Sequence, residues 1–106
     1  MTYAMVLDVL GDPTRRRIFE RLRQGPSSVA DLAAGLPVSR PAVSQHLKTL
    51  KQAGLVMDLA QGARRIYRLD MSGLAPLRSW LEQLGEEAAE AYQAEIQNQI
   101  DERKST

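Results

Sequence analysis

Residues 36–54, LPVSRPAVSQHLKTLKQAG, carry the most informative pattern in this chain. Ser39 is a favourable N-cap for a helix. Pro41 falls in the first turn of that helix, where its missing N–H costs nothing. Apolar residues then recur at i, i+4 and i+7, which predicts an amphipathic helix with a buried face of Val43, Leu47 and Leu50.

The opposite face of this predicted helix is polar and carries no carboxylate. At about 100° per residue it is made of Pro41, Ser44, Gln45, Lys48 and Gln52. Hydroxyl, amide and ammonium groups can hydrogen-bond base edges and phosphates in the major groove of DNA. A solvated amphipathic helix would show the same pattern, so the flanking segments have to decide between the two interpretations.

Two helices are predicted before this stretch. Asp12-Pro13 is a helix start, and residues 14–24 follow with a buried stripe before Gly25-Pro26 ends them. Ser28 and Asp31 resemble a capping box that opens a helix over 29–36. With the turn at 35–38, residues 28–53 then have the order helix, short turn, helix of a helix-turn-helix. The buried residues expected in these two helices are Ile18, Phe19, Leu22, Val29, Leu32 and Ala33.

Residues 55–70 change to a period of two, which is typical of strands. LVMDLA and RIYRLD are expected to pair through a Gly-containing hairpin at 61–64. A hairpin directly after a DNA-facing helix would be a wing, and Arg64 and Arg65 at its tip could meet the phosphate backbone or the minor groove. For Tyr67 we favour packing on the sheet over stacking on a base.

The C-terminal third predicts a dimerisation helix. Apolar residues follow one another in steps of three and four from Leu74, which makes a stripe along a helix of about 25 residues, roughly 40 Å long. A chain this small has too little core to bury that stripe alone, so pairing with a second copy is favoured over folding back on its own domain. Gly85 is expected to interrupt the helix, and its end past Tyr92 to fray.

We therefore assign residues 1–10 and 73–102 to a dimer interface. Its predicted members are Met5, Val6, Val9, Leu74, Leu77, Trp80, Leu81, Leu84, Ala88 and Ala91.

Length, charge and cysteine content set the outer bounds. The 106 residues fit a single domain, 1–106. Residues 1–70 hold 11 Lys and Arg against 6 Asp and Glu, whereas residues 71–106 hold 3 against 7, so a basic body precedes an acidic tail. The chain has no Cys, no apolar run long enough to cross a membrane and no signal sequence. We expect a cytoplasmic protein with no membrane partner.

At this point the motifs carry a specific resemblance. GDPTRRRIFERL, VADLAAGLPVSRPAVSQHLKTLKQAGLV and GARRIYRL, in order over roughly residues 8–84, resemble the ArsR/SmtB family of winged-helix repressors. The resemblance implies a mainly α winged helix-turn-helix with a β-hairpin wing and a dimeric bacterial regulator that leaves its operator on a signal. It also implies DNA contacts from Arg40, Pro41, Ser44 and Gln45 and from the wing arginines.

The chain departs from the metal-sensing members of that family. Where they carry a cysteine pair, this sequence has Ser27-Ser28-Val29-Ala30-Asp31, and its C-terminal helix has no His. A transition-metal site needs three or four N, S or O ligands in a compact shell, and the sequence offers no such set. For Glu86, Glu87 and Glu90 we favour a solvated acidic face over a weak cation site. We expect no metal and no cofactor.

The predicted function is that of a homodimeric repressor on an inverted-repeat operator, with recognition helices in successive major grooves. Ser44 and Gln45 would read bases, and Arg40, Lys48, Arg64 and Arg65 would contact phosphates. The alternative is a winged-helix module that acts mainly by protein–protein interaction. An enzyme is disfavoured, because the single His lies on the predicted DNA-facing helix. The sequence also has no Cys nucleophile, no glycine-rich phosphate loop and no carboxylate pair in a pocket-like context. The inducing signal is not indicated. The full predicted DNA-binding set is Ser39, Arg40, Pro41, Ser44, Gln45, His46, Lys48, Arg64 and Arg65.

Overall fold

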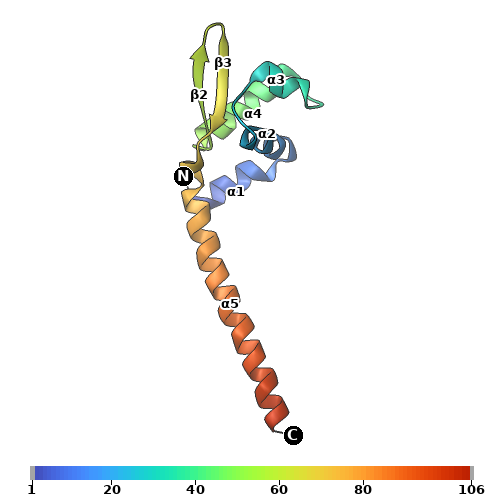
Figure 1. The fold of residues 1–106 in the computed structure, drawn as a ribbon, viewed down its shortest axis with the longest axis vertical. Coiled ribbons are helices and arrows are strands. Elements are labelled where there is room, and N and C mark those ends of the chain that lie inside the picture. Colours follow the sequence, from blue (N-terminus) through green and yellow to red (C-terminus); the bar gives the residue numbers. More distant parts are fainter. Residues whose placement is uncertain (1, 106) are drawn as a thin grey trace.

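The computed structural model describes residues 2–105, which form five helices and a small sheet (Figure 1). The first and last residues of the predicted 1–106 domain lie outside this range. The helices are α1 (Tyr3–Gly11), α2 (Pro13–Arg23), α3 (Val29–Ala34), α4 (Arg40–Gln52) and α5 (Ala75–Lys104), with a 3-10 turn η1 (Met71–Leu74) before α5. The strands are β1 (Ser27–Ser28), β2 (Val56–Gln61) and β3 (Arg64–Leu69).

The sheet is antiparallel, with strand order β1-β3-β2. The β2–β3 hairpin has the predicted position, and Gly62 at its turn has a φ of 63°, a conformation that favours glycine. The two-residue strand β1 was not predicted, because Ser27 and Ser28 resemble only a helix cap. In the fold they also pair with Tyr67 and Ile66 of β3. This pairing joins the wing to the start of α3.

The core lies between α1, α2, α3, α4 and the base of the hairpin. Its members include the predicted stripes of α2 and α4, which confirms the helical periodicity read from the sequence. Val29 and Ala33 pack against the core at partial exposure, while Leu32 is fully buried. The buried apolar residues are Val6, Ile18, Phe19, Leu22, Leu32, Val43, Leu47, Leu50, Ala53, Leu55 and Val56.

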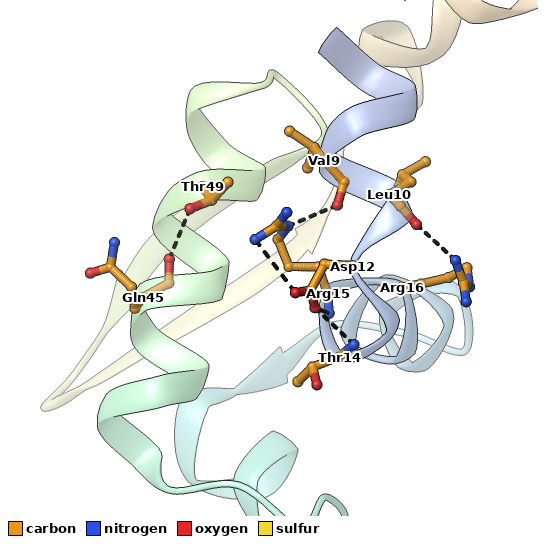
Figure 2. A network of polar contacts seen from close by, with 8 residues as sticks. All are labelled: Val9, Leu10, Asp12, Thr14, Arg15, Arg16, Gln45 and Thr49. Atoms are coloured by element: carbon orange, nitrogen blue, oxygen red, sulfur yellow. Dashed lines mark hydrogen bonds and ion pairs between the residues drawn. The ribbon is translucent and has the colours of Figure 1, made fainter. Parts of the chain in front are cut away.

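The junction between α1 and α2 explains the sequence GDPTRRR. The Asp12 carboxylate accepts from the backbone N–H of Thr14 at 2.9 Å and of Arg15 at 3.0 Å, which caps α2 (Figure 2). In the other direction, Arg15 Nε donates to the Val9 carbonyl at 2.8 Å and Arg16 Nη1 to the Leu10 carbonyl at 3.0 Å. These bonds satisfy carbonyls that the end of α1 leaves open, and they fix α1 against α2.

A close backbone contact holds the end of α4 against the start of α5. Gly54 follows α4 with a φ of 74°, as expected for a residue just past a helix end. Gly73 in η1 approaches so closely that a Cβ there would lie 1.9 Å from the Gly54 carbonyl oxygen. Only glycine fits at position 73, and this contact places α5 relative to the helix-turn-helix.

The last helix differs most from its prediction. It is continuous for 30 residues from Ala75, rather than about 25, and it remains helical to Lys104 beyond the point at which fraying was expected. Gly85 lies inside the helix and does not interrupt it. Figure 1 shows α5 projecting from the end of the body opposite the wing, which makes the chain 75 Å long in its largest dimension.

None of the helices within residues 2–105 is long and apolar enough to cross a membrane.

Candidate nucleic-acid interface

The polar face of α4 is open to solvent, as the helical periodicity predicted. Arg40, Pro41, Ser44, Gln45 and Lys48 are all exposed, while the opposite face of α4 is completely buried. Figure 2 shows the Gln45 amide pointing away from α2, on the free side of the helix. In the part of the chain that the structure describes, neither Arg40 nor Lys48 forms an ion pair. Both cations are therefore available to an anionic partner.

Two residues at the margins of this face have structural contacts of their own. The Ser39 hydroxyl accepts from the Ala42 backbone N–H at 3.3 Å and so caps α4, as predicted. His46 is half-buried and lies near enough to Asp12 to contribute to that carboxylate's lowered pKa. The main cause of the lowered pKa is the hydrogen bond from the Arg15 backbone. His46 thus faces the start of α2, at the edge of the polar face of α4.

The wing arginines are exposed, but each forms an ion pair with an aspartate of the same chain. Arg64 Nη2 donates to Asp31 Oδ2 at 2.9 Å and to the Ser28 hydroxyl at 2.7 Å, so it ties the wing tip to the start of α3. Asp31 therefore pairs with the wing instead of completing the predicted capping box, although its backbone N–H does donate to the Ser28 hydroxyl. Arg65 Nη1 donates to Asp58 Oδ2 at 2.5 Å.

The fold brings three of the predicted phosphate-contacting residues together. Arg40 at the start of α4 and Arg64 and Arg65 at the wing tip line one hollow, together with backbone and small side chains at the start of α3. Arg40 lies 24 residues before Arg64 in sequence. Their convergence gives the recognition helix and the wing a shared cationic surface, which suits an extended polyanion.

Asp58 and Lys51 are residues of this region that sequence reasoning did not single out. Asp58 accepts from Lys51 Nζ at 2.7 Å and from Arg65, and only 5% of its side chain is exposed. The hydrogen bonds from Lys51 and Arg65 hold the pKa of Asp58 below its ordinary value, and the same contact raises the pKa of Arg65. The one available signal was an acidic residue on a strand of an otherwise cationic wing.

The predicted dimer residues fall into three groups by their exposure. Met5, Leu81, Leu84, Ala88 and Ala91 are exposed. Val9, Leu74 and Leu77 are half-buried against the core, and Trp80 stacks on Tyr3 with ring centroids 4.7 Å apart. Val6 is a correction: it is completely buried inside its own protomer, so it cannot contact a second copy.

No group of three or more His, Cys, Asp or Glu side chains suited to a metal ion occurs among residues 2–105.

Comparisons with known proteins agree with this geometry. The helix-turn-helix domain family matches residues 10–58. The chain is 53% identical over 92 residues to the HTH-type transcriptional regulator Rv2034 of Mycobacterium tuberculosis, covering 87% of this chain and 86% of that one. It is 34% identical over 76 residues to the transcriptional repressor SdpR of Bacillus subtilis, covering 72% and 84% of the two chains.

Solved structures of other proteins share this fold over most of the chain. An ArsR-like transcriptional regulator from Rhodococcus sp. RHA1 superposes with a TM-score of 0.73 at 35% identity, over 87% of each chain. The chain belongs to the ArsR/SmtB family of winged helix-turn-helix transcriptional regulators. The homodimeric winged helix-turn-helix DNA-binding domain of a possible ArsR-family regulator from Mycobacterium bovis superposes with a TM-score of 0.63 at 28% identity, over 83% and 82% of the chains. The predicted fold class is confirmed.

Proposed function

We propose that this ArsR/SmtB-family regulator is a homodimeric repressor that binds an inverted-repeat operator. The observation that carries the proposal is the single cationic surface formed by the exposed face of α4 and the wing arginines. In a two-fold dimer, the two α4 helices would enter successive major grooves roughly 34 Å apart, while the wings contact the flanking backbone. Such a complex covers promoter DNA and blocks polymerase.

Different residues carry affinity and sequence choice in this proposal. Ser44 and Gln45 read base edges, since a glutamine amide can pair with adenine through two hydrogen bonds. Arg40, Lys48, Arg64 and Arg65 contact phosphates, because their charges lie at the start and side of the helix and at the wing tip. Operator affinity should then fall steeply as salt concentration rises.

The dimer is assigned to α1 and α5. The first half of α5 carries an open, almost entirely apolar hollow lined by Leu74, Leu77 and Leu81, with the Arg78–Glu82 ion pair at its rim. Leu81 and Leu84 are 51% and 44% exposed, a poor position for leucine in an isolated protomer. A second α5 would cover this stripe.

The regulator is also proposed to work in the cytoplasm without a resident metal. The chain has no Cys, and its one His lies on the edge of α4 beside Asp12. Added zinc should therefore leave operator affinity unchanged when the protein is titrated into operator DNA.

Hydroxyl-radical footprinting on the DNA upstream of the protein's own gene tests the proposal. We expect two protected half-sites in inverted orientation, with centres about one helical turn apart. Inserting 5 base pairs between them should abolish tight binding, because it rotates one half-site to the opposite face of the duplex. Weak protection without half-sites would instead favour the alternative of a winged-helix module that acts through a protein partner.

A further inference from the structure

Asp58 joins the recognition helix to the wing. One of its carboxylate oxygens binds Lys51 in the last turn of α4, and the other binds Arg65 on β3 near the wing tip. Asp58 itself lies on β2, opposite Tyr67, which packs against the core. Three elements that would meet the DNA together are thus connected through one side chain.

The burial of Asp58 separates this contact from an ordinary surface ion pair. Its side chain is 5% exposed, whereas the Arg64–Asp31 pair on the other side of the wing has side chains that are 59% and 64% exposed. An exposed pair adds little and can exchange partners with water or phosphate. Lys51 and Arg65 are each 56% exposed, but the carboxylate between them is nearly covered, so separating it from both cations costs more than breaking an exposed pair.

On the basis of charge alone, a carboxylate at this location weakens DNA binding. It neutralises two cations on the surface that faces the phosphate backbone, and each neutralised cation lowers sequence-independent affinity. A benefit of Asp58 that offsets this loss of affinity has to come from the way it positions the helix and the wing. A helix and a wing read one operator in one register only if the angle between them is fixed.

We propose that Asp58 is a positioning residue for DNA recognition, which fixes the wing against α4 and raises sequence discrimination at the expense of non-specific affinity. The inference rests on the proposed function, since it assumes that α4 and the wing contact the same duplex. It assigns to Asp58 no contact with DNA.

The test compares three variants by fluorescence anisotropy on the footprinted operator and on a scrambled duplex of the same length. Asp58→Asn removes the central carboxylate, and Lys51→Gln removes the helix-side cation of the same contact. Asp31→Asn is the matched control, because it removes an equal charge beside the same wing tip but from an exposed pair. Thermal unfolding and sedimentation check that each variant is folded and has the assembly state of the wild type.

Asp58→Asn and Lys51→Gln, the two bridge variants, change the net charge in opposite directions. Both should nevertheless discriminate less well between the operator and the scrambled duplex. We expect the ratio of operator to scrambled affinity to fall on the order of tenfold in both, with tighter scrambled binding for Asp58→Asn and weaker scrambled binding for Lys51→Gln. Asp31→Asn should tighten both complexes and leave the ratio unchanged.

Unchanged ratios in both bridge variants would overturn the positioning role, since charge alone would then account for their effects. If Asp58→Asn does not fold, the ratio for Lys51→Gln decides, because that side chain is 56% exposed and not needed for the core. A wild-type protein that fails to discriminate between the duplexes would instead refute the proposed function.

Discussion

Gln45 and Lys48 lie one turn apart on the exposed face of α4, yet their chemistry assigns them different tasks. An amide can donate to and accept from a single base edge, so it reports which base is present. An ammonium on a flexible stem neutralises a phosphate whatever the sequence. Their proximity makes them a matched pair for mutagenesis, since in the proposed complex both side chains would meet the same stretch of groove.

Gln45→Ala should therefore relax specificity at one operator position. We expect a loss of about 1–3 kcal/mol on the operator and little change on scrambled DNA. Lys48→Ala should weaken both complexes alike and reduce the salt dependence by about one phosphate contact. Anisotropy titrations at several salt concentrations measure both effects. Equal operator preference in wild type and Gln45→Ala would show that bases are read elsewhere.

Acid should destabilise the protein through Asp12 and Asp58. Both carboxyl groups have a pKa below the ordinary value in the folded state, Asp12 through backbone hydrogen bonds and Asp58 through Lys51 and Arg65. A lowered pKa adds stability that is present above the unfolded value of about 4 and is lost as pH falls through the folded one. Urea unfolding between pH 7 and pH 2.5 should show this loss, and it should be smaller in Asp58→Asn. An equal pH dependence in that variant would contradict the assigned cause.

At the residue scale, the sequence predicts side-chain contacts correctly where the two partners are close together in the chain. The caps at Asp12, Ser28 and Ser39 follow from residue type and spacing, because donor and acceptor lie within three positions. The partners of Arg64 and Arg65 did not follow. The Arg65–Asp58 contact depends on the register of the hairpin, and the contacts of Arg64 with Ser28 and Asp31 depend on the pairing of β3 with β1. These partners lie 7 to 36 positions apart in sequence.

At the scale of elements, the contact between Gly54 and Gly73 fixes where α5 leaves the body. Disrupting this contact should lower the free energy of unfolding. In Gly73→Ala the added Cβ would lie 1.9 Å from a backbone oxygen, so η1 must shift, at a cost of about 1–3 kcal/mol in the free energy of unfolding. Chemical denaturation measures this loss.

Gly11→Ala is the matched control for that substitution. Position 11 has nothing within 4 Å of an added Cβ, so stability should hold or rise by about 0.4–1 kcal/mol. Equal stability of the two variants would mean that η1 does not hold α5 as described.

The elements themselves were predictable to different degrees. The buried stripes of α2 and α4 follow from an apolar period that only a helix satisfies. The strand β1 was missed because two serines carry no period, and their pairing is decided by β3. The extent of α5 was underestimated because the polar sequence after Tyr92 was expected to fray, although ladders such as Gln97–Asp101 support the helix there.

At the scale of the whole molecule, an isolated protomer leaves an apolar surface of α5 exposed to solvent. The body and its cationic surface lie at one end, and α5 carries exposed leucines and no buried residue over its 30 positions. The sequence could predict this stripe, but not that Val6 turns inward while Met5 beside it is 49% exposed. That difference depends on how α1 is rotated against α2.

Leu81→Glu should therefore dissociate the dimer. A carboxylate in the centre of an apolar helix seam is left without a partner, so the dimer dissociation constant should rise on the order of 100-fold. Ser79→Glu adds the same charge on the opposite, exposed side of α5 and should leave the dimer intact. Sedimentation equilibrium distinguishes the two. Dimers of unchanged strength in Leu81→Glu would place the interface elsewhere.

We propose that a dimer of this chain recognises one DNA sequence through α4 and the wing. Fluorescence anisotropy tests it most directly, with the wild-type protein titrated into the duplex upstream of its own gene and into a scrambled duplex at about 150 mM salt. We predict tight binding to the upstream duplex alone, saturating at two subunits per duplex. Equal and weak binding to both duplexes would contradict the account and would favour a protein partner for the same surface.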